Sequence, residues 1–172
     1  MKWKRITLAV AVLLAAVVSV SALQAAQPRR SQVEAPAFVQ WSVNGQLVGE
    51  REPAPLRARD FHASWTTGGA VFVWTKNGQL NSDAIESPSG ANGFRVVWGK
   101  LATKFRSAAW QRNGTDVAVI PLAKGSNGVY VRLNGGGVFD SAFWSRREQV
   151  LQPVTPAPGA NDVLVELKSS VR

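Results

Sequence analysis

The residues that could do chemistry are few. The only histidine, His62, lies two residues after Asp60 and close to several serines. An acid, an imidazole and a hydroxyl are the groups of a Ser-His-Asp hydrolase. The chain contains no G-x-S-x-G sequence to position a nucleophile, and with no cysteine and one histidine it lacks the ligands of a zinc site. We therefore expect no enzyme activity and interpret His62 as a solvated loop residue.

A second set of candidates lies in the polar stretch of residues 81–93. Its oxygen-bearing side chains are Asn81, Asp83, Glu86 and Asn92. Their spacing differs from that of an EF-hand loop, and only two of the four carry charge. We interpret them as turn residues. The sequence predicts no metal site and no cofactor.

Tryptophan is abundant after residue 26, at positions 41, 65, 74, 98, 110 and 144. An exposed indole can stack on a sugar ring, but most of these residues alternate with Val or Phe and are expected in the core. Trp65, beside Gly68-Gly69, is the best candidate for exposure. Trp144, beside Arg146-Arg147, is the second. A secreted carbohydrate-binding module that uses exposed Trp is therefore the alternative function.

A repeated W-x-x-N-G pattern predicts the β-hairpins that must position these residues. Asn-Gly suits the two positive-φ positions of a type I′ turn, which joins antiparallel strands. A fourth copy has Val in place of Trp, and the spacings of 33, 36 and 21 residues are too uneven for a solenoid or propeller. The copies begin at Trp41, Trp74, Trp110 and Val131.

Short alternating segments separated by such turns predict an all-β fold. We expect an immunoglobulin-like antiparallel β-sandwich, or a small barrel, over residues 37–152. Residues 153–161 contain three prolines and are interpreted as a linker. Residues 162–172 form a C-terminal strand and tail. That strand, with Val163 and Val165 on one face, either closes the domain's own sheet or adds to the sheet edge of a neighbour.

The amino-terminal segment is apolar after a basic start. Residues 6–26 carry no charge and predict a hydrophobic helix, with Ile6, Leu13, Leu14 and Val18 among its apolar residues. Residues 1–26 fit either a cleaved signal peptide or an uncleaved membrane anchor with its amino terminus in the cytoplasm. Residues 27–36 then form a tether. Both interpretations place the remaining chain outside the cytoplasm, in a bacterial periplasm or at the cell surface.

The net charge of +9 implies attraction to anionic surfaces. Several basic residues alternate with apolar ones in the predicted strands. If they gather on one face, that face would bind an acidic partner, anionic lipid or a charged glycan; nucleic acid is not expected for an exported domain. These residues are Arg57, Arg59, Arg95, Lys104, Arg106, Arg112 and Arg132.

These observations favour a non-enzymatic binding or structural protein, held at the membrane as an accessory subunit that braces another envelope or membrane protein. Trp65, Trp144, Arg146, Arg147, Val163 and Val165 are the candidate partner-binding residues.

The intact mass of the protein from membrane and soluble fractions separates the two interpretations of the amino terminus. An anchor predicts a membrane-bound chain that retains residues 1–26. A signal peptide predicts a soluble chain that lacks about that many residues. A full-length chain found only in the soluble fraction would contradict both.

Overall fold

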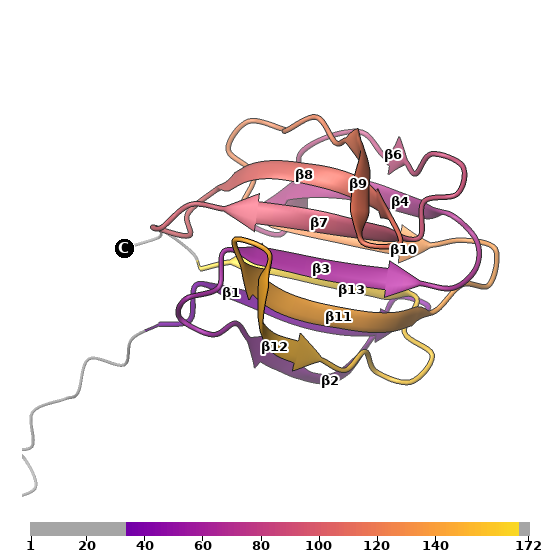
Figure 1. Cartoon of the computed structure of the whole chain (residues 1–172), viewed down its shortest axis with the longest axis horizontal. Helices are drawn as coiled ribbons and strands as arrows, with labels where there is room; N and C mark the ends of the chain where they lie inside the picture. Colours follow the sequence, from indigo (N-terminus) through magenta and orange to yellow (C-terminus); the bar gives the residue numbers. More distant parts are fainter. Residues whose placement is uncertain (1–33, 169–172) are drawn as a thin grey trace, which may run out of the picture. The chain divides into compact units, whose positions relative to one another are not determined.

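The computed structural model describes residues 34–168, which contain thirteen strands and no helix. The strands form two antiparallel sheets that lie face to face, with apolar side chains between them (Figure 1). The prediction of an all-β sandwich is therefore confirmed.

Sheet A has the order β2-β1-β13-β10-β4-β5, with β6 beside β4. Its strands are β1 (Ala37–Val43), β2 (Gln46–Pro53), β4 (Ala70–Lys76), β5 (Gln79–Leu80), β6 (Ile85–Glu86), β10 (Gly128–Leu133) and β13 (Asp162–Leu167). Sheet B has the order β12-β11-β3-β7-β8-β9. Its strands are β3 (Asp60–Trp65), β7 (Gly93–Trp98), β8 (Phe105–Arg112), β9 (Thr115–Val119), β11 (Phe139–Arg146) and β12 (Gln149–Val154).

Three of the four predicted hairpins are present. At residues 44–45, 77–78 and 113–114 the Asn and Gly both have positive φ, near 50° and 80°, as a type I′ turn requires. The fourth prediction is wrong, because Asn134-Gly135 follows β10 in sheet A and leads to β11 in sheet B. The fourth hairpin instead joins β11 to β12 at Arg147-Glu148, with φ of 49° and 68°.

With this hairpin included, residues 37–167 form a fourfold repeat. Trp41, Trp74, Trp110 and Trp144 each stand three residues before a hairpin turn, at even spacings of 33, 36 and 34 residues. Each lies near the end of the first strand of a unit whose first two strands form the hairpin and whose third strand joins the opposite sheet. The units are β1-β2-β3, β4-β5-β7, β8-β9-β10 and β11-β12-β13. The spacing is uneven only when Val131, which precedes no hairpin, is counted as the fourth copy.

The strand registers repeat as well. Each hairpin Trp lies opposite the second residue of a third strand: Trp41 opposite Val163, Trp74 opposite Val129, Trp110 opposite Phe94, and Trp144 opposite Phe61. The two central pairs also match, since Tyr130 lies opposite Leu164 in sheet A and His62 lies opposite Arg95 in sheet B. The two sheets are thus built to one plan.

The aromatic core joins the two sheets. The six indoles within residues 34–168 are each at most 2% exposed. Trp41 of sheet A meets Phe139 of sheet B at 5.3 Å between ring centroids, and Trp74 meets Phe105 at the same distance. Tilted and edge-to-face contacts of this kind are favourable in addition to the burial of apolar area.

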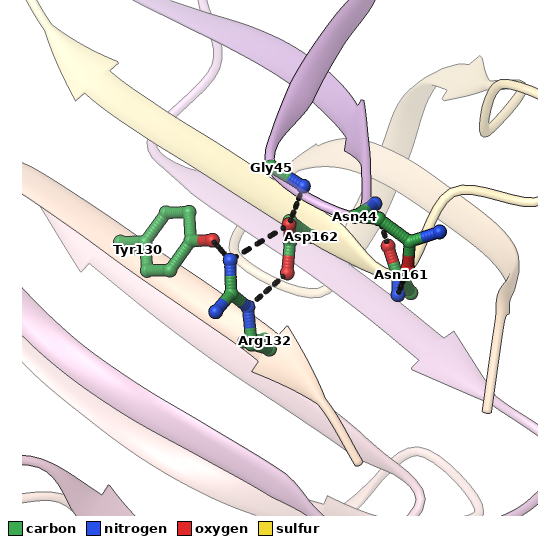
Figure 2. Close-up of polar contacts among 6 residues, drawn as sticks. All are labelled: Asn44, Gly45, Tyr130, Arg132, Asn161 and Asp162. Atoms are coloured by element: carbon green, nitrogen blue, oxygen red, sulfur yellow. Dashed lines mark hydrogen bonds and ion pairs between the residues drawn. The ribbon is translucent and has the colours of Figure 1, made fainter. Parts of the chain in front are cut away.

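Asparagine pairs clasp three of the hairpins. In Figure 2, the Asn44 backbone N–H donates to Asn161 Oδ1 (2.8 Å), and Asn161 Nδ2 donates to Asn44 Oδ1 (2.9 Å). Asn77 with Asn127 and Asn113 with Asn92 form the same two bonds. At the fourth hairpin Arg59 occupies the Asn position; its backbone N–H still donates to Ser145 O, as the three asparagines donate to the equivalent carbonyls.

The C-terminal strand is internal to the fold. β13 pairs with β1 on one side and β10 on the other, so it closes the domain's own sheet. Residues 153–161 are not a linker, because Pro153 lies in β12 and the following turn buries Ala160 completely. The domain therefore continues to β13.

The predicted anchor residues Ile6, Leu13, Leu14 and Val18 lie outside the described residues. Within residues 34–168, no helix is long and apolar enough to cross a membrane.

The repeat predicts that the fourth hairpin carries avoidable backbone strain. Replacing Arg147-Glu148 by Asn-Gly should raise the free energy of unfolding by about 1–2 kcal/mol, because non-glycine residues are disfavoured at positive φ. Urea unfolding measures this change. The matched reverse variant, Asn77→Arg with Gly78→Glu, should destabilise by at least as much because it also breaks a clasp. Equal stability of all three proteins would contradict the analysis.

Candidate functional site

A groove of about 850 Å³ crosses the outer face of sheet B. One wall is the β8–β9 turn with Thr115 and Asp116, and the other is the β11–β12 hairpin with Glu148 and Val150. Register shifts in both hairpins accompany this arrangement, and in Figure 1 β9 runs at a steep angle to β7 and β8. The groove therefore lies between two copies of the repeated hairpin.

The centre of the groove is a row of side chains across three strands. Phe143 of β11 lies opposite His62 of β3, and His62 lies opposite Arg95 of β7. The rings of His62 and Phe143 stack with centroids 4.5 Å apart and planes 14° apart. His62 was expected in a loop; it is instead a half-buried strand residue, because its neighbours Phe61 and Ala63 point into the core.

A polar network fixes this row. Gln111 Nε2 donates to Asp116 Oδ1 (2.9 Å), and Arg95 Nη2 donates to Asp116 Oδ2 (2.5 Å). Gln111 Oε1 is then free to accept from His62 Nδ1, 3.2 Å away. The imidazole therefore carries its proton on Nδ1. Burial is the largest effect on its pKa and lowers it from the usual value, so His62 is neutral at pH 7.

A second row of small polar groups runs beside the first. Ser64 Oγ donates to Asp140 Oδ1 and also lies 2.9 Å from Ser141 Oγ. Gly93 adds no side chain to this part of the groove, and a Cβ there would meet the Ala63 carbonyl oxygen at 3.0 Å. The two serines bond to one another and Ser64 also bonds to Asp140, whereas His62 bonds to Gln111. The site offers donors, acceptors and a ring face for binding.

The two tryptophans expected at the surface are buried. Trp65 is 1% exposed, and its Nε1 donates to the Gly68 carbonyl. Trp144 is 0% exposed. Both side chains point between the sheets. The Ser, Thr and Arg residues next to them in the sequence lie on the outer face or in the turns, because neighbours in a strand point to opposite faces. The expectation that Trp65 and Trp144 are exposed is wrong.

The remaining candidate residues separate into two groups. Val163 and Val165 are fully buried in β13, whose two edges are both paired, so this strand has no free edge for a neighbour. Arg146 and Arg147 are exposed on the β11–β12 hairpin, at one side of the groove. The structure therefore leaves only the two arginines accessible.

Two of the four predicted turn residues of segment 81–93 make side-chain bonds within the fold. Asn92 clasps Asn113, and Asn81 Nδ2 donates to Lys124 O and Ser126 Oγ. Within residues 34–168, no group of three or more acidic or histidine side chains could hold a metal ion.

Sequence reasoning missed Gln111 and Phe143 and did not connect Arg95 with His62. The one sequence signal for Phe143 and Gln111 is strand alternation. Each is next to a buried Trp, and neighbours in a strand point to opposite faces, so both point outward. Comparison with protein-family models, with curated proteins and with solved structures finds no match.

The neutral, half-buried imidazole predicts a pH-dependent stability. The folded-state pKa of His62 lies below 6.5, so the unfolded chain binds more protons as the pH falls through 6.5. Stability should therefore be complete above that pH and decrease on acidification. Urea unfolding at pH 7.5 and at pH 5.5 should show this decrease, and His62→Gln should reduce it. The pKa of Asp60 is raised chiefly by burial, so this residue favours the folded state on acidification. Its contribution is the same in the parent protein and in His62→Gln, so the difference between them reports His62. An identical pH dependence in the variant would contradict the assignment.

Proposed function

We propose that the domain is a non-enzymatic binding protein that acts outside the cytoplasm and holds another envelope or membrane protein in the groove of sheet B. The observation that carries the proposal is the groove itself. Its volume of about 850 Å³ can receive several side chains of a partner. Its centre combines a ring pair with an arginine, residue types that are frequent in protein interfaces.

The order of the groove supports a recognition role. The Arg95–Asp116 ion pair and the Gln111 amide hold the central row in one arrangement. A preorganised surface loses less side-chain entropy when a partner binds. The groove could therefore bind a partner without first ordering its own side chains.

The groove favours a protein partner over a sugar. With the indoles buried, only Phe143 and His62 offer rings, and each covers one face of the other. No broad aromatic platform is then available for a sugar ring. The immunoglobulin-like type of the sandwich and the accessory-subunit role both stay predictions.

Site-specific photo-crosslinking in the producing cells tests the groove. A photoreactive residue at Ser141, exposed in the groove, should give one discrete adduct with an envelope or membrane protein. Ser64→Arg should remove that adduct, because a long charged side chain would fill the groove. The same photoreactive residue at Leu122, which is 48% exposed and does not line the groove, is the control. Adducts that survive Ser64→Arg, or that form equally from Leu122, would refute the proposal.

A further inference from the structure

A second surface lies at one end of sheet B, where three separate segments meet. The Arg59 backbone N–H donates to Ser145 O (2.9 Å), and the Trp98 N–H donates to Arg59 O (2.8 Å). These bonds bring the ends of β7 and β11 beside the start of β3, on the left in Figure 1. Six exposed basic side chains lie on these segments and at the start of β8, which pairs with the end of β7. We name this surface the basic corner: Arg57, Lys100, Lys104, Arg106, Arg146 and Arg147.

The charge of the basic corner is not neutralised locally. Within residues 34–168 the ion pairs are Arg51–Glu166, Arg95–Asp116 and Arg132–Asp162, and none includes a residue of the corner. Two acids lie close to the corner. Asp60 is buried and accepts a hydrogen bond from Ser145, and Glu148 is exposed on the β11–β12 hairpin. The corner therefore presents a net positive surface.

The basic corner is also where the fourfold repeat breaks its own pattern. Arg57 stands where the other units have Gly90, Gly125 and Gly159, all with positive φ. Arg59 replaces the clasp asparagine, and Arg147-Glu148 replaces Asn-Gly. All three departures introduce arginine at the contact between the first and fourth units. The last of them places two non-glycine residues at positive φ, an arrangement that costs stability and is typical of functional positions.

Two exposed leucines accompany the charges. Leu56, next to Arg57, is 54% exposed, and Leu101, next to Lys100, is 72% exposed. Basic residues together with apolar ones are the combination that binds the interface of an anionic membrane, through headgroup attraction and shallow burial.

The described chain ends lie at this same end of the domain. Lys168 N–H donates to Pro36 O (3.1 Å), and Ala54 N–H donates to Ala37 O (2.8 Å), which places the Leu56 turn near the start of β1. The chain thus enters the domain beside the basic corner. In the sequence, Arg29-Arg30 and the predicted hydrophobic segment precede this point of entry.

We propose that the basic corner binds the anionic lipid headgroups of a membrane surface, with Leu56 and Leu101 entering the interface. This rests on the location of the domain at a membrane, as proposed above, and not on the groove. Lipid is favoured over an acidic protein because the exposed leucines and the entry of the chain lie at the same end.

The experiment uses the full chain, which contains no cysteine, so that an introduced Cys is the only labelling site. Leu101→Cys carries an environment-sensitive dye and is mixed with vesicles of phosphatidylcholine, alone or with an equal part of phosphatidylglycerol. We expect a blue shift only with phosphatidylglycerol, weakened by added salt. Leu47→Cys, 69% exposed at the opposite end of the domain, should not shift.

A triple variant isolates the charge. Arg57→Ser with Arg146→Ser and Arg147→Asn should weaken the binding of the corner to anionic vesicles on the order of 100-fold, because each basic residue contributes about fivefold. Its urea unfolding midpoint shows that it is folded. An equal shift in phosphatidylcholine alone, no shift in either vesicle, or a shift that the triple variant retains would overturn the proposal. Flotation with phosphatidylcholine vesicles measures membrane binding by the hydrophobic segment separately. A chain that floats without a dye response contradicts only the proposal for the basic corner. A chain that floats with neither vesicle contradicts the membrane location as well.

Discussion

The packing of six indoles between the two sheets is the constraint on which the rest of the structure depends. Trp41, Trp74, Trp110 and Trp144 each stand at the same place in a first strand, opposite the second residue of a third strand. A shift of one residue in any of these pairings would turn the indole to the solvent face. The tryptophans therefore fix the strand register, and the register fixes where each hairpin turns and which residues reach the outer faces.

The sequence could predict this framework because its signals are local. Asn-Gly occupies both positive-φ positions in three hairpins, and alternation marks most of the long strands. The fourth hairpin could not be found in the same way, because Arg147-Glu148 has no turn preference, whereas Val131 to Gly135 imitates the pattern and leads into the other sheet. Likewise, Pro153 and the residues after it have the composition of a linker, but pairing on both sides of β13 makes them part of the domain.

The groove could not be predicted from the sequence because it depends on contacts across strands. His62 and Arg95 are 33 positions apart and lie opposite each other only because β3 and β7 pair. The ring of Phe143 completes the row from a third strand. The basic residues are a stronger signal, since their number and spacing predict a positive surface, but which of them lie together depends on the loops. Arg57, Lys104 and Arg106 meet at one end, whereas Arg112 and Arg132 lie at the other.

The central place of β13 has a consequence for the order in which the domain can form. Residues 162–167 separate β1 from β10, and these two strands begin 91 positions apart in the chain. Until that last strand arrives, sheet A is divided into two pieces that each expose an unpaired edge. Contacts between such distant segments form slowly, and open edges invite wrong pairing. An unfinished chain would thus remain vulnerable to proteases and aggregation until residues 162–167 are available for pairing.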